Sequence, residues 1–295
     1  MGFNFVIKKW SIFYFFIQNL SEWHFSNRKE YNLKWKESLS NFSLEEKKAL
    51  FKFKKLHSRY SFGELYLGRS FFTKKDPLIF LKQKLSKKDF TIIESCFLIF
   101  KKKFDLFYKK ELPLLKRWQI TLKKEVDKKQ MDEIDKAISR LYNSPSLLEI
   151  ITVYLLPSTE NYTGGMGGVI NDTSILLEIS RLPVKKLNQA LGIIWHEILH
   201  LSHYKKWQVA PLLIKKLGNN KKIINLSEEM IITSLFPNGI LGTRFLKNKN
   251  QGLNKNLSLE KVSSLIKLSD EYLIKGRAID ERYLDALFKI ISLRQ

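Results

Sequence analysis

The spacing of hydrophobic residues changes near residue 145, and this change limits the chain to few fold classes. Before it, apolar residues recur every three or four positions, as on the buried face of an amphipathic helix. After it, residues 148–156 are rich in β-branched and apolar types and end at Pro157, a pattern that favours a strand. We therefore expect a predominantly helical α+β protein, with a helical N-terminal region over residues 1–145 and a second domain over residues 146–295.

Two capping signals and a proline predict the helices of the N-terminal region. Ser43 and Glu46 have the spacing of a capping box, in which each side chain binds the backbone N–H of the other residue. Ser86 begins a second helix in a similar way. Pro113 favours a restart of the chain, so a third helix should continue from there to Leu141.

The composition excludes several classes of protein. The chain has 295 residues, of which 44% are hydrophobic, so it can bury enough apolar surface to fold. Cys96 is the only cysteine, which excludes a disulfide scaffold. The apolar segment Trp10–Leu20 is shorter than the roughly 18 residues of a membrane-spanning helix, and no small-residue cleavage site follows it. We expect it to be the first buried helix of a cytoplasmic protein; a membrane-surface anchor is the alternative.

The charge balance is strongly basic, with 52 Lys and Arg against 29 Asp and Glu. Such an excess fits nucleic acid or an anionic surface as partner. However, the lysines are spread along the chain and far outnumber the arginines, which make the better bidentate contacts to bases and phosphates. The charge therefore weakly favours an acidic substrate or an anionic surface, and it does not specify nucleic acid.

Three segments lead to the most informative motif. Residues 161–168 are rich in glycine and predict a flexible loop, without the spacing or the lysine of a nucleotide-binding loop. Residues 175–179 predict a second short strand. Pro183 then opens a long helix whose apolar stripe, from Val184 to Leu201, should pack on a core.

This helix carries the motif HExxH, formed by His196, Glu197 and His200. Residues four apart lie on the same face of a helix, so both imidazoles can reach one metal ion. Glu197 lies about 100° around the helix from His196 and can hold the water that the metal binds. The alternative is a helix with two buried, hydrogen-bonded histidines.

A tetrahedral metal site of this kind needs a third protein ligand. Lys206 stands where one class of HExxH protein has its third histidine, which excludes that class. His203 is not excluded as a ligand, although it lies a full turn beyond His200. Glu228 and Glu229 are the strongest candidates, in the first turn of an apolar helix expected to begin near Ser227; acids there also complement the helix dipole.

These residues resemble the zincin metallopeptidases of the gluzincin type. The resemblance implies that His196, His200 and a downstream glutamate bind Zn²⁺, that Glu197 is the general base, and that the substrate is a peptide or protein. The residues after Glu229 match the family pattern better than those after Glu228, whereas helical periodicity favours Glu228. We take Glu229 as the third ligand and keep Glu228 as the alternative.

The resemblance covers about residues 148–236 and departs from the family pattern at Ser202 and Ile232, neither of which is a ligand. It implies a zincin-like catalytic part in which a small β-sheet packs on the HExxH helix. The strand at residues 175–179 would be either an edge strand that binds an extended substrate or an ordinary strand of the sheet.

Further roles stay open at this point. An oxyanion donor could come from His203, Tyr204, Arg282 or Tyr283, and Thr233 is a candidate partner for a histidine ligand. Two functions of other classes are alternatives: a basic helical nucleic-acid-binding protein with a chance HExxH, and a metal-bound interaction module without peptidase activity.

Overall fold

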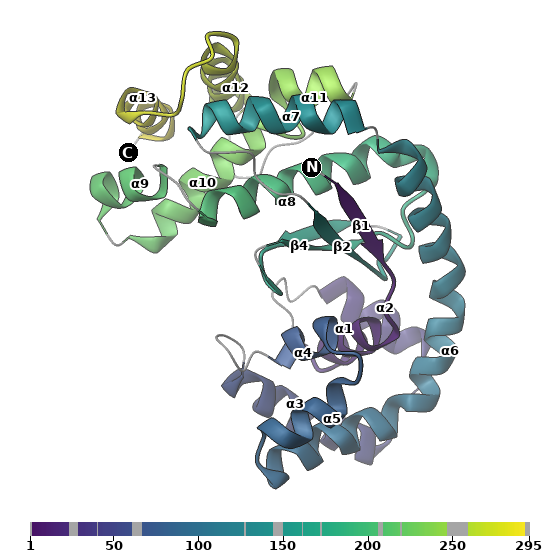
Figure 1. Ribbon diagram of the computed structural model, residues 1–295. Coiled ribbons are helices and arrows are strands. Elements are labelled where there is room, and N and C mark those ends of the chain that lie inside the picture. The colour runs from purple at the N-terminus through teal and green to yellow at the C-terminus, as the bar shows by residue number, and fades with distance from the viewer. Residues whose placement is uncertain are drawn as a thin grey trace.

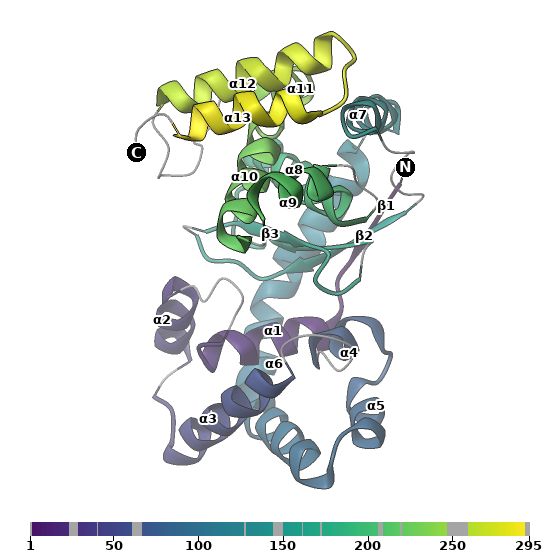
Figure 2. The same cartoon turned by 90° about the vertical axis from the view of Figure 1, so that its left-hand side faces the viewer.

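The computed structural model describes residues 2–23, 29–39, 41–60, 67–126, 128–143, 150–160, 162–171, 173–205, 209–218, 220–246 and 259–292. A small sheet lies between two groups of helices (Figures 1 and 2). Helices α1 to α5 lie on one side of it, and α7 to α13 lie on the other. The long helix α6 runs from one group to the other.

The first group is built around α1 (Lys9–Leu20), which is buried at every residue from Ser11 to Leu20. This confirms the expected buried helix. The helices α2 to α5 follow it in the chain at Lys29–Ser38, Leu44–Arg59, Leu67–Thr73 and Pro77–Lys84. The capping box of Ser43 and Glu46 is present at the start of α3, with both reciprocal hydrogen bonds.

Helix α6 spans Lys87–Glu125 and begins at Ser86, which caps it as expected. The predicted restart at Pro113 is wrong, because this proline lies inside the helix. The buried residues keep one helical spacing on both sides of it: Phe100, Phe104, Phe107, Glu111, Leu115, Trp118 and Leu122. Packing of this continuous face offsets the roughly 3 kcal/mol that an interior proline costs. The chain breaks later, and α7 follows at Lys128–Leu141.

The sheet has four strands in the order β1-β2-β4-β3. β1 (Phe3–Val6), β2 (Ile151–Leu156) and β4 (Ser174–Glu178) are parallel, and β3 (Gly164–Gly167) is antiparallel to β4. The prediction of a flexible loop over residues 161–168 is wrong for its central part, because β3 is the edge strand. The predicted strand at residues 175–179 is β4; it lies between β2 and β3, so it cannot be the substrate-binding edge.

The second group begins with η1 (Val184–Lys186) and contains α8 to α13, at Leu187–Lys205, Val209–Leu217, Lys221–Leu235, Gly239–Leu246, Leu259–Ile274 and Glu281–Ser292. Helix α10 starts at Lys221, six residues before the expected start at Ser227. Glu228 and Glu229 therefore lie in its interior, and stabilisation by the helix dipole does not explain them. The apolar residues Ile223 and Ile224 extend the helix forward, and Asn220 caps it by accepting from the N–H of Ile223.

The described residues form a mostly helical α+β fold with a small mixed sheet, as expected. The division into domains at residue 145 stays a prediction. β1, which is far from β2 in sequence, pairs with it in the sheet, from Phe3 opposite Ile151 to Val6 opposite Tyr154. Within the described part of the chain, no helix combines the length and apolar character needed to cross a membrane.

Candidate functional site

Helices α8 and α10 bring two histidines and one glutamate together. Nε2 of His196 lies 3.2 Å from Nε2 of His200. The carboxylate of Glu229 reaches both rings, with Oε1 at 3.3 Å from Nε2 of His196 and Oε2 at 3.2 Å from Nε2 of His200. Of the residues predicted as ligands, these three form one cluster whose ligand atoms all lie within 4.8 Å of one another.

The spacing of these atoms matches that of ligands around zinc. Two ligands that each lie about 2.0–2.1 Å from a tetrahedral zinc ion are about 3.3 Å apart. The contacts between His196, His200 and Glu229 measure 3.2 to 3.3 Å. Two imidazoles and a carboxylate are also the donor set of known catalytic zinc sites, which leave one further position for water. The three residues therefore offer a set of donors that zinc can bind, with ligand atoms all within 4.8 Å of one another.

The outer nitrogens of both histidines have partners of their own. Nδ1 of His200 lies 3.2 Å from Oε1 of Glu228, which is only 3% exposed. Nδ1 of His196 lies 3.3 Å from the carbonyl oxygen of Phe236, the residue that ends α10. Once a metal has displaced the second proton of each ring, donation from Nδ1 would leave Nε2 as the lone-pair atom that faces the cluster. Glu228 thus lies on the opposite side of the His200 ring from Glu229.

The carboxylates around His200 favour its protonated form. Burial opposes protonation, but hydrogen bonds to Glu228 and Glu229 outweigh burial and raise the pKa of His200 to about 10. Burial likewise opposes protonation of His196, whose pKa is nevertheless raised by Glu229 and the nearby Glu197. Burial would raise the pKa of Glu229, yet the two imidazoles hold it well below its ordinary value. A metal ion entering this cluster must therefore displace protons from the histidines.

Glu197 projects from α8 toward the edge strand β3. Its Oε2 accepts a hydrogen bond of 2.7 Å from the backbone N–H of Gly167. A Cβ at Gly165 would lie 2.7 Å from Cγ of Glu197, and a Cβ at Gly167 would lie 2.7 Å from its carbonyl oxygen. Both distances are shorter than real Cβ contacts, so only glycine allows β3 to approach the helix this closely.

Glycine has a similar role behind the histidines. A Cβ at Gly192, one turn before His196, would meet Pro237 and Leu246 at 3.3 Å. The missing side chain at Gly192 leaves room for this close approach of another chain segment. It lets the turn after α10, whose Phe236 carbonyl contacts His196, lie against α8.

Sequence reasoning missed some residues of the site and misjudged others. It assigned no role to Gly165, Gly167 or the Phe236 carbonyl, although a glycine inside a strand can mark a place where another backbone approaches closely. Tyr283 is fully buried and bonded to Ser269, so it is not available as an oxyanion donor. Ser269 in turn contacts Ser234 of α10, so these residues belong to the packing behind the helix.

The other candidates of the sequence analysis lie elsewhere. The histidine nitrogens contact Glu228 and Phe236, so the proposed partner role of Thr233 has no support in these contacts. Arg282 is an exposed residue at the start of α13. The side chains of His203 and Tyr204, and all of Lys206, lie outside the described residues.

Comparison with protein families, with curated proteins and with solved structures found no match to this chain. The resemblance to zincin peptidases therefore depends on the site residues themselves.

Proposed function

We propose that this protein is a zinc-dependent metallopeptidase with a zincin-like catalytic part. The observation that carries the proposal is the convergence of His196, His200 and Glu229 in one cluster, with Glu197 on the same helix and hydrogen-bonded to the edge strand β3. His196, His200 and Glu229 would hold the metal. Zinc bound there would lower the pKa of a water molecule and polarise the carbonyl of the peptide bond.

Glu197 would act as the general base. The N–H of Gly167 holds Oε2 of this carboxylate and so fixes its position. Its Oε1 can then take the proton of the attacking water and pass it to the leaving amine. The same hydrogen bond restricts rotation of the side chain, which lowers the entropic cost of reaching the reactive geometry.

Strand β3 would bind the substrate as an extended peptide. β3 pairs on one side with β4, and the N–H of Gly167 points away from β4 toward Glu197. Alternate residues of a strand share the direction of their N–H groups, so the N–H of Gly165 is on this same outer edge, where the N–H of Gly167 is already taken by Glu197. An added strand would make main-chain hydrogen bonds there, with little selection for side chains.

Zinc content and peptide hydrolysis test the proposal together. We expect about one zinc ion per chain in the wild type and in Glu197→Gln, and loss of zinc in His200→Ala. Glu197→Gln should lower the rate of hydrolysis of a peptide library by about 10²–10⁴-fold, because only the proton acceptor is removed. Glu125→Gln is the control, because it makes the same substitution at an exposed position of α6. It should leave the zinc content and the rate of hydrolysis unchanged.

Three outcomes would contradict the proposal. A fully active Glu197→Gln variant would exclude Glu197 as the base. A wild type that binds no added zinc would make HExxH a coincidence, and the basic surface would then favour a nucleic-acid-binding function. Stoichiometric zinc without hydrolysis of any peptide would identify a metal-bound module that is not a peptidase.

A further inference from the structure

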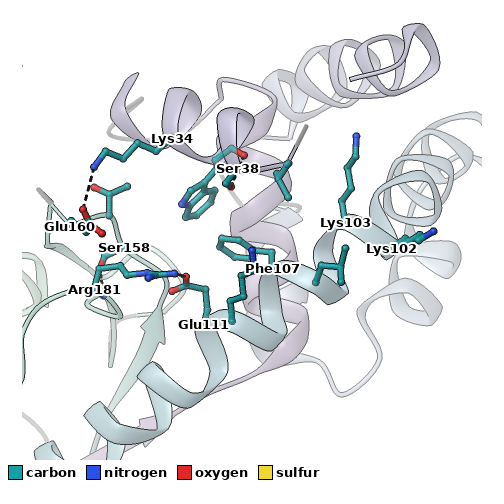
Figure 3. A pocket seen from close by; sticks show the side chains of 14 residues that line it. Lys34, Ser38, Lys102, Lys103, Phe107, Glu111, Ser158, Glu160 and Arg181 are labelled. Atoms are coloured by element: carbon teal, nitrogen blue, oxygen red, sulfur yellow. Dashed lines mark hydrogen bonds and ion pairs between the residues drawn. The ribbon is translucent and has the colours of Figure 1, made fainter. Parts of the chain in front are cut away.

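A second site lies away from the candidate metal centre, in a cavity of about 640 Å³. It lies between α2, α6 and the loops that follow β2 and β4 (Figure 3). Because β2 and β4 are parallel, both loops lie at the carboxyl end of the sheet. Pockets of 300–1,000 Å³ are typical of small-molecule sites, so this open cavity has room for a metabolite-sized ligand.

The lining of the cavity is positively charged. Five of its residues are cationic and two are acidic: Lys34, Lys102, Lys103, Lys110 and Arg181 against Glu111 and Glu160. Lys103 pairs with Glu46, and Lys34 lies 3.9 Å from Glu160. Lys102 and Lys110 are exposed and have no ion pair with any residue that the structure describes. The cavity therefore favours an anion.

Arg181 is held rigidly in the wall of this cavity. Its backbone N–H donates to Oγ of Ser158 at 2.8 Å. Its guanidinium donates through Nε and Nη2 to Oε1 of Glu111, at 3.1 and 2.5 Å. Ser180 donates to the other oxygen of Glu111, and Ser158 donates its N–H to Ser180. The buried carboxylate of Glu111, 3% exposed, thus fixes a guanidinium that is 37% exposed.

The fixed guanidinium is prepared to bind an anion. Its contacts with Glu111 use Nε and Nη2. The remaining nitrogen, Nη1, and the exposed edge of the guanidinium can therefore donate hydrogen bonds to a ligand. Arginine donors in a planar fork match the oxygens of phosphate and carboxylate. Because the side chain is already ordered, binding would cost little of its conformational entropy.

The middle of the cavity is apolar. The ring of Phe107 lies between Arg181 on one side and Lys102 and Lys103 on the other in Figure 3. Leu39 and Leu106 also line the cavity, and Leu106 is 59% exposed. A ligand with an apolar or aromatic body would cover these groups while its anionic end contacts the cations.

We propose that this cavity binds a small organic phosphate, through Arg181 and Lys110 at the phosphate and Phe107 and Leu106 at the organic body. The site shares no residue with the metal centre, so this proposal does not depend on the peptidase proposal. Binding would connect α2 and α6 with the carboxyl end of the sheet, and it should therefore raise the thermal stability of the chain.

Calorimetric titration with phenyl phosphate tests this site. Inorganic phosphate and phenol, which each carry one part of this probe, are titrated separately for comparison. We expect one phenyl phosphate per chain, bound more tightly than either part. Lys110→Gln should weaken binding at least threefold, and Arg181→Gln about tenfold. Lys116→Gln removes the same charge from an exposed position on the same helix, outside the cavity, and should change the affinity less than twofold.

The design separates a built site from general surface charge. Arg181→Gln leaves Glu111 without its guanidinium and could unfold the chain, so the exposed Lys110→Gln decides the result. Equal weakening by Lys110→Gln and Lys116→Gln, or several phosphates per chain, would overturn the proposal. So would equal binding of anionic vesicles by the wild type and Lys110→Gln, combined with no saturable binding of phenyl phosphate.

Discussion

The imidazole of His200 has a carboxylate at each nitrogen. Glu229 faces Nε2 and Glu228 faces Nδ1, both at 3.2 Å. Because the two glutamates are adjacent in α10, their side chains diverge by about 100° around the helix and can reach opposite sides of one ring. This arrangement accounts for the conflict between the two sequence arguments. Periodicity favoured Glu228 because it shares a helix face with apolar residues, and the structure buries it there, whereas the family pattern favoured Glu229.

Substitution of each glutamate should distinguish these two positions. Glu228→Gln keeps an acceptor near Nδ1 but removes the charge, so zinc affinity should fall by about 10–100-fold. Glu229→Gln removes a negatively charged ligand and should cost more. Competition with a chromophoric chelator measures both affinities, and Glu125→Gln serves as the control. If Glu229→Gln keeps wild-type affinity while Glu228→Gln loses zinc, Glu228 is the third ligand.

Local signals explain which elements could be predicted from the sequence. The start of α3 depends on Ser43 and Glu46, three residues apart, and HExxH depends on residues within one turn. β1 and β3 are each four residues long. β1 is stabilised by pairing with β2, which is distant in sequence, and the glycine-rich β3 is stabilised by pairing with β4. Such pairing leaves little local pattern. The close approach of β3 to Glu197 is also set by tertiary packing. The glycines of β3 permit this approach, but they do not specify it.

Pro113 shows the reverse case, a local signal that tertiary packing overrides. It lies on the exposed face of α6, where its ring avoids the core but still removes one backbone hydrogen bond. Pro113→Ala restores that bond and should raise the free energy of unfolding by about 1–3 kcal/mol, as urea unfolding would measure. Ile120→Ala, at another exposed position of α6, should change it by less than about 0.5 kcal/mol. Equal or lower stability of Pro113→Ala would mean that the helix is interrupted at this residue.

At the scale of the whole molecule, the candidate metal site is assembled by a contact between two helices. α8 supplies both histidines, and α10 with its final turn supplies Glu228, Glu229 and the Phe236 carbonyl. The sequence identifies the two histidines and the two glutamates, but neither their convergence nor the Phe236 carbonyl, because both depend on how α10 crosses α8. Zinc bound to both helices should therefore stabilise the fold as well as complete the site.

The pH dependence of zinc binding follows from the protons in this contact. The pKa of His200 is raised from 6.5 to about 10, so its pairing with the carboxylates stabilises the metal-free fold fully below pH 6.5. That contribution is lost as the pH rises through about 10. Zinc must displace the same proton, so its affinity should increase as the pH rises from 6.5 to 8.5, by up to about tenfold per unit for each proton released.

Two measurements check this dependence. Chelator competition gives the zinc affinity at pH 6.5, 7.5 and 8.5, and thermal unfolding gives the stabilisation by zinc at the same values. Both should increase with pH in the wild type, whereas His200→Ala should bind no zinc and gain no stability from it at any of these values. The stabilisation by zinc increases with pH for two reasons. The metal-free fold loses its internal ion pair, and fewer protons compete with zinc for the histidines. An affinity that stays constant over this range would mean that His200 is already neutral before zinc binds, and that Glu228 and Glu229 do not hold a proton on its ring.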